Sequence, residues 1–482
     1  MGGSLVPQPP PPRNKVVEEI TSTDMHADKS DTAGSVFVTT FKSMVGSGFI
    51  GLPFAMASSG WLGGALVICI VWWFTSITMK QLIESAEIVK DRNPRMPSSL
   101  IDYGELGYQS FGSVGKYLCI LPVIATQWIA GCSFIVFIVS AMSPVLCGQD
   151  CNDLDRTEER LLLVVIITQI GLAMAPSPAF LTGVANIGNM FLVLCTVFAV
   201  YHGIVTSPPQ LSNAAVFETI EGCYICFGIS CFTFSAHSQG ISIFSAAGPR
   251  ARAAYSRVVD SVLVMAAAFY LFFAVFNYLC YGKNTASIVF DNMGDSIANT
   301  LVKTSLCLML MCNFPLSVFP VHQSIELALG LARNSPTAKP PSLEMAEQGN
   351  GTANNTNSAP PLWSYQKASE GGEQEQQQYA TLPEVGIAPS QRLSRVVVIV
   401  LAGVAAYYSG GAFALVVAIG GGFNGIMAFV NPPLCHLRLR YGTWSAMPLG
   451  KRLLYVILVG CGVVGGGGAL WQGLNGLINH SQ

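Results

Sequence analysis

Long apolar stretches alternate with short polar stretches along most of the chain, between about residue 34 and residue 477. A helix that crosses a bilayer needs about 20 mostly apolar residues, because each residue advances the helix by about 1.5 Å. The pattern therefore predicts an all-α, multi-pass membrane protein with about eleven transmembrane helices. The predicted spans are 34–58, 61–87, 116–143, 160–177, 181–206, 219–246, 258–281, 297–328, 393–410, 412–437 and 452–477.

Two segments break this pattern and divide the chain. We expect residues 1–33 to form a disordered N-terminal tail and residues 331–391 a disordered loop, because neither holds enough apolar residues to bury a core. The runs EGGEQEQQQ and NGTANNTNSAPP both lie in the loop. The first eight predicted helices then occupy 34–330, and the last three occupy 392–482.

Composition supports a lipid-embedded protein. Apolar residues make up 51% of the chain and charged residues 11%, against about 25% charged in ordinary soluble proteins. The expected surroundings are therefore a lipid bilayer. The net charge of −2 gives no reason to expect a nucleic-acid partner.

Positive charges predict the orientation of the helices. If the N-terminus lies in the cytoplasm, most of the 25 lysines and arginines fall in cytoplasmic segments, as membrane proteins prefer. The tail 1–33 and the loop 331–391 are then both cytoplasmic. The sequence leaves vacuolar, lysosomal and plasma membranes all open.

Two of the predicted helices are interrupted near their middles. The first contains Gly46-Ser47-Gly48 followed by Pro53, and the sixth contains the polar run SAHSQG at 235–240. Spans one and six are equivalent members of a five-plus-five inverted repeat, an arrangement in which broken helices hold the substrate. The eleventh helix is then an addition to the repeat.

A broken helix suits a zwitterionic ligand. The interruption leaves backbone N–H and C=O groups unpaired, and in lipid these groups need a ligand or a protein-lined cavity. Exposed amides fit a carboxylate and exposed carbonyls fit an ammonium group. The other interpretation is that the glycines only allow close helix packing. The predicted substrate-binding residues are Val45, Gly46, Ser47, Gly48, Phe234 and Ser235.

Three polar residues within the predicted helices are candidates for binding a coupling ion or replacing it. Lys42 lies one turn before the first interruption, His237 lies within the second, and Asn313 precedes Pro315 in the eighth helix. A buried ammonium group can take the place of a sodium ion, and a histidine can exchange protons near neutral pH. Snorkelling of Lys42 and a purely structural hydrogen bond by His237 are the competing interpretations.

Most of the 14 cysteines lie in apolar runs and are expected to pack as small apolar residues. Cys147 and Cys151 lie in a polar loop, and Cys280 ends another apolar run. If these positions face an oxidising compartment, they are candidates for a disulfide.

Four motifs in order resemble the amino acid/auxin permease family. They are TFKSMVGSGFIGLPFAMASSGW in the first helix, SLIDYGELGYQSFGSVGKY at 99–117, FTFSAHSQG in the sixth helix and NFPLSVFPVHQSIE at 313–326. The resemblance implies an eleven-helix amino acid transporter with a leucine-transporter-like fold. Lys42 is similar to the residue found in proton-coupled transporters and vacuolar exporters of small neutral amino acids, where sodium-coupled members have asparagine. Thr39 replaces a histidine of the proton-coupled animal members, so the resemblance does not identify the proton acceptor.

The prediction is thus a secondary active transporter of small neutral amino acids, coupled to protons and independent of sodium. An amino acid sensor that uses the same site with little transport, and a sodium-coupled symporter, are the alternatives. An enzyme is not expected, because the histidines are scattered and the sequence lacks the common catalytic and metal-binding motifs. We therefore expect neither a cofactor nor a metal.

Overall fold

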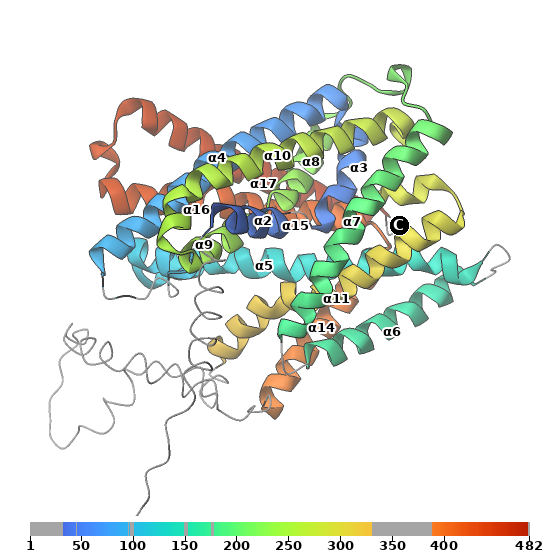
Figure 1. The fold of residues 1–482 in the computed structure, drawn as a ribbon, viewed down its shortest axis with the longest axis horizontal. Coiled ribbons are helices and arrows are strands. Elements are labelled where there is room, and N and C mark those ends of the chain that lie inside the picture. Colours follow the sequence, from blue (N-terminus) through green and yellow to red (C-terminus); the bar gives the residue numbers. More distant parts are fainter. Residues whose placement is uncertain are drawn as a thin grey trace, which may run out of the picture.

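The computed structural model describes residues 32–480 except 45, 95, 97–100, 149–152, 175–177 and 330–387. Its described part is built from helices joined by short connections (Figure 1). The helices are α2 (Ala33–Met44), α3 (Leu52–Ser59), α4 (Trp61–Arg92), α5 (Tyr103–Cys147), α6 (Leu154–Ala173), α7 (Pro178–Thr206), α8 (Ile220–Thr233), α9 (His237–Ala246), α10 (Pro249–Tyr281), α11 (Ile297–Ala328), α14 (Pro389–Tyr408), α15 (Phe413–Phe429), α16 (Asn431–His436) and α17 (Leu449–His480).

Every predicted span coincides with a helix or a pair of helices. Seven of the described helices are long and apolar enough to cross a membrane, or eight if the bent pair of α2 with Ser47–Ser59 is counted as one span. The other three predicted spans correspond to α6, α7 and the pair α8–α9. The first two turns of α6 carry several charges, and α8 and α9 have only 14 and 10 residues. The all-helical prediction is confirmed for the described residues.

The helices pack in two groups. In the first, α2, α3, α4, α8, α9 and α10 contact one another, and in the second α5, α6, α11 and α14 do so. Helix α15 lies between the groups, against α8 on one side and α5 on the other, while α17 covers α15 and α8. Figure 1 shows α2 near the middle of the molecule, with α10 on one side and α5 on the other.

Helix α5 begins earlier than the sequence pattern predicts. It starts at Tyr103 and continues past a kink at Phe111 and Gly112, where Gly112 has a positive φ of 67° that favours glycine. Asp102 caps the first turn by accepting a hydrogen bond from the Glu105 backbone N–H at 2.7 Å. The early turns are too polar for a transmembrane pattern, so the apolar count placed the start at 116.

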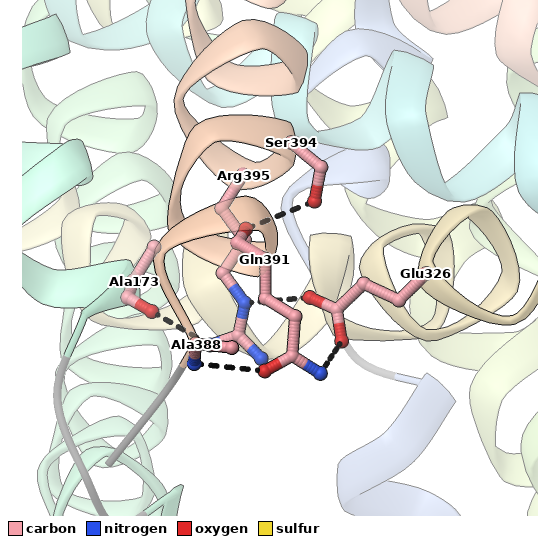
Figure 2. A network of polar contacts seen from close by, with 6 residues as sticks. All are labelled: Ala173, Glu326, Ala388, Gln391, Ser394 and Arg395. Atoms are coloured by element: carbon pink, nitrogen blue, oxygen red, sulfur yellow. Dashed lines mark hydrogen bonds and ion pairs between the residues drawn. The ribbon is translucent and has the colours of Figure 1, made fainter. Parts of the chain in front are cut away.

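A polar network joins α6, α11 and α14 at one end of the second group (Figure 2). The Arg395 Nε lies 2.9 Å from Glu326 Oε1, and the side chains are 14% and 8% exposed. Arg395 also donates to the Ala173 carbonyl, and Gln391 donates to Glu326. Residues 330–387 lie between Glu326 and Gln391 in sequence, so this network connects helices on either side of that segment.

Candidate functional site

The first interruption separates α2 from α3. Helix α2 ends at Met44, a 3-10 turn, η1, runs from Ser47 to Gly51, and α3 begins at Leu52. Gly46 has extended backbone angles, and Pro53 occupies the first turn of α3. Because proline needs no N–H partner there, it suits the restart of the helix. The axis bends by 47° across the interruption.

The second interruption separates α8 from α9 at Phe234, Ser235 and Ala236. In an unbroken helix, the Cys231 carbonyl would accept a hydrogen bond from the Ser235 backbone N–H. Here it instead accepts a hydrogen bond from the side-chain amide of Asn424 on α15. The protein therefore satisfies this carbonyl with a neighbouring helix rather than with its own chain.

The two interruptions lie against each other. A Cβ atom added to Gly48 would come within 2.9 Å of both Phe232 Cδ1 and Thr233 Oγ1 at the end of α8. The turn η1 thus depends on glycine for its closeness to α8. Part of the glycine motif therefore serves packing, which was the competing interpretation of the sequence.

Tyr270 of α10 supports both interruptions. Its hydroxyl donates to the Met44 carbonyl at the end of α2 at 3.0 Å, and its ring meets that of Phe234 edge-on with centroids 5.2 Å apart. The carbonyl of Met44 is one of those that a helix end leaves without an intrahelical partner. Tyr270 and Asn424 hence stabilise the ends of α2 and α8, respectively.

The predicted substrate-binding residues differ in their exposure. Ser47, Gly48 and Phe234 are buried, Ser235 is half-buried, and Gly46 is exposed. Among the described residues, the buried Ser47 hydroxyl has no hydrogen-bond partner, and a Cβ on Gly46 would meet no atom within 4 Å. Val45 lies outside the described residues. An unpaired buried hydroxyl is costly, so Ser47 is suited to bind a ligand.

Lys42 lies on the exposed side of α2, two residues before the helix ends. It shares this side with Val38 and Thr39, while Val36, Thr40 and Met44 form the buried side. Its ammonium group has no hydrogen bond or ion pair within the described part of the chain. The charge is therefore available next to the first interruption.

His237 is fully buried at the start of α9. Its Nε2 lies 2.8 Å from the hydroxyl oxygen of Thr78 on α4, and that hydroxyl lies 2.9 Å from the Phe74 carbonyl. Because a carbonyl can only accept, the single hydrogen of the hydroxyl is used on Phe74, so Nε2–H of His237 must be the donor. The other ring nitrogen, Nδ1, then carries a buried lone pair, which has no partner in the part of the chain that the structure describes.

Asn313 is half-buried on α11, which packs mainly against α5 and α7. The two interruptions meet where η1 contacts α8, and α8 belongs to the other group of helices.

Asn424 is not among the site residues predicted from the sequence, although it is the one polar side chain in the run FALVVAIGGGFNGIMAF of α15. That isolation within an apolar helix was a usable signal.

The cysteine prediction needs one correction. Cys147 is disulfide-bonded, and Cys151 lies outside the described residues. Cys280 has a free thiol that is buried near the end of α10, next to Gly203 of α7. Its thiol is buried against α7 instead of meeting another cysteine, so Cys280 leaves the set of bridging cysteines.

The site is made of hydroxyls, an imidazole, an amide and helix ends. Across the residues that the structure describes, no three His, Cys, Asp or Glu side chains are grouped to hold a metal ion. The groups that are present can form hydrogen bonds, and the imidazole can bind a proton.

Comparison with known proteins gives a consistent family. Residues 29–474 match the model of the family described as "Transmembrane amino acid transporter protein". The chain is 25% identical over 302 residues to amino acid transporter ANT1 of Arabidopsis thaliana, covering 62% of this chain and 67% of that one. It is 22% identical to the Arabidopsis amino acid transporter AVT3A, covering 62% and 69%.

More distant similarities also exist. Solute carrier family 38 member 10 of Rattus norvegicus is 21% identical over 294 residues, which are 60% of this chain and 26% of that protein. Among solved structures, the inward-facing conformation of Mhp1 aligns over 93% of this chain and 90% of its own, with a TM-score of 0.47 and 13% identity.

Proposed function

The chain belongs to the transmembrane amino acid transporter family, and from this premise we propose that it moves small neutral amino acids by alternating access. Transport is coupled to protons and needs no sodium. The observation that carries the proposal is the contact between the two interruptions, where η1 lies on the end of α8 beside the unpaired Ser47 hydroxyl.

The polarity of this contact favours a zwitterion. The end of α8 offers carbonyl groups with partial negative charge, and the start of α9 offers amides with partial positive charge. A carboxylate and an ammonium group on one small molecule match the two ends. The rings of Phe49 and Phe234 both pack against Tyr270, and we expect this aromatic cluster beside the interruptions to favour substrates with small side chains.

The coupling ion is proposed from Lys42 and His237. The Lys42 ammonium group supplies a fixed positive charge next to the end of α2, where a sodium-coupled transporter would need a bound cation. The buried Nδ1 of His237 is a proton acceptor at the second interruption. The five-plus-five inverted repeat, the cytoplasmic N-terminus and the disorder of 1–33 and 331–391 remain parts of the same proposal, except at the edges of the two segments, because Ala33 belongs to α2 and Pro389–Gln391 belong to α14.

Transport is tested with purified protein in liposomes. We expect uptake of labelled alanine, glycine or proline, accelerated by a pH gradient and unchanged when sodium is replaced by potassium. A requirement for sodium would contradict the role of Lys42. Specific binding without uptake would favour the amino acid sensor instead.

Replacement of Lys42 by alanine should abolish uptake without loss of thermal stability, because its ammonium group has no described partner. Lys116→Ala is a matched control, since Lys116 lies on α5, a helix that contains neither interruption. Equal uptake by both variants would mean that Lys42 only reaches toward the membrane surface.

A further inference from the structure

Asn424 contacts the second interruption from a separate helix. It lies in α15, is 1% exposed and directs its side-chain amide at the segment between α8 and α9. The backbones of α15 and α8 come very close one turn earlier, at Gly421 and Gly228, where there is no space for a Cβ. This closeness brings the short Asn424 side chain within reach of the break.

The Cys231 carbonyl determines which way the Asn424 amide points. A carbonyl has no hydrogen to donate, so the group of Asn424 that faces it must be the Nδ2 donor. The Oδ1 atom therefore faces the opposite partner, which is the Ser235 hydroxyl at 3.2 Å. Oδ1 can only accept, so the Ser235 hydroxyl must donate its single hydrogen to Asn424.

The Ser235 hydroxyl has then used its only hydrogen, so it can interact with any other group only as a hydrogen-bond acceptor. Its hydroxyl cannot donate to a carboxylate, but it can accept an N–H. The position lies just beyond the end of α8, where the last carbonyls also carry partial negative charge. Hydroxyl and carbonyls together form a set of acceptors that fits a cation bearing N–H groups.

We propose that Asn424 is a positioning residue that fixes Ser235 as a hydrogen-bond acceptor for the α-ammonium group of the substrate. The inference rests on the proposed function and extends it to the substrate class. Amino acids with a primary or secondary ammonium group fit the set, whereas a trimethylated ammonium group has no N–H to offer it.

The test compares Asn424→Leu, Ser235→Ala and the double variant in proteoliposomes. We expect each single change to raise the KM for alanine about tenfold while changing the maximal rate little, which corresponds to about 1.4 kcal/mol. The double variant should be no worse than Ser235→Ala, because Asn424 acts through Ser235. The preference for glycine over its N-methyl, N,N-dimethyl and trimethyl derivatives should weaken in all three variants.

Asn431→Leu is the matched control. Asn431 is also a buried asparagine, and it donates to the Leu118 carbonyl on α5 at 3.1 Å, away from the break. Its loss should lower thermal stability and leave the KM and the methylation series unchanged. An equal rise in KM for Asn431→Leu and Asn424→Leu, or additive effects of Asn424 and Ser235, would overturn the inference alone. Wild-type protein that neither binds nor transports any amino acid would overturn the proposed function as well.

Discussion

Gly48 and Thr233 approach so closely that a Cβ on Gly48 would lie 2.9 Å from the Thr233 hydroxyl oxygen. The neighbouring glycine of the same motif, Gly46, has no atom within 4 Å of its added Cβ. Two glycines separated by one residue thus have different roles. Gly48 lets the two broken helices pack closely, and Gly46 borders open space among the described residues.

This difference predicts opposite outcomes for two alanine substitutions. Gly48→Ala should separate η1 from α8, lower stability by about 1–3 kcal/mol, as overpacking does, and abolish uptake. Gly46→Ala should retain stability, since its φ of −114° is accessible to alanine, and its effect on uptake reports how closely the substrate approaches this predicted binding residue. Thermal unfolding in detergent and uptake in liposomes measure the two effects. Loss of uptake in both variants at unchanged stability would mean that the substrate contacts both glycines.

The location of the interruptions could be predicted from the sequence, because glycine, proline and polar residues stand out within apolar runs. The partners of the interruptions could not. Asn424 reaches α8 only because α15 packs against it through Gly421, and that contact depends on the three-dimensional arrangement of helices far apart in sequence.

The start of α5 shows a second limit. Its capping pair, Asp102 and Glu105, is visible in the sequence, with the spacing that helix starts prefer. The predicted span nevertheless excludes residues 103–115, because a run of apolar residues indicates burial in lipid rather than helix formation. These polar turns are helical, but the pattern of apolar runs alone does not predict them as part of α5.

His237→Gln separates proton binding from structure. A glutamine can still donate to Thr78, but it cannot take up a proton as the imidazole does. If His237 accepts the coupled proton, the variant should fold and exchange amino acids across the membrane while losing acceleration by a pH gradient. Uptake that still responds fully to the gradient would assign the proton to another group.

Thr78→Val is the structural counterpart of that experiment. It removes the hydroxyl that His237 contacts and leaves the buried Nε2–H unpaired. We expect a loss of about 1–3 kcal/mol of stability, the cost of one unsatisfied buried polar group. Unchanged thermal unfolding would show that His237 finds another partner.

Removal of the Arg395 charge should be strongly destabilising. Arg395→Met leaves Glu326 buried without its ion pair, and breaking such a pair costs about 3–5 kcal/mol. The matched control is Arg156→Met, because Arg156 and Asp153 are 70% and 65% exposed. Exposed pairs contribute about 0–1 kcal/mol. Similar unfolding temperatures for the two variants would contradict the buried position of Arg395.

Lys303→Met should destabilise the protein more at neutral than at acidic pH. The Lys303 ammonium group lies 2.7 Å from Asp291, and the two side chains are 8% and 36% exposed. Burial raises the pKa of Asp291 and Lys303 opposes that rise, so loss of Lys303 should raise this pKa further.

A raised pKa means that the folded protein binds the Asp291 proton more tightly than the unfolded chain does. The variant is therefore relatively more stable at acidic pH, and it loses stability as pH rises above the unfolded value. We expect about 2 kcal/mol at pH 7, less than for a fully buried pair because Asp291 is partly exposed. Unfolding curves from pH 3.5 to 8 measure this difference, because the unfolded pKa of an aspartate is about 3.9, and adding Asp291→Asn should remove its pH dependence.

The network of Glu326, Gln391 and Arg395 joins α11 to α14 through side chains alone, independently of the covalent link between the two helices. A gene cut within residues 330–387 would yield two polypeptides whose matching ends still carry one half of an ion pair each. Such fragments, produced together in one membrane, are expected to recover the intact assembly by complementation, so the transporter can be made in two pieces and labelled separately.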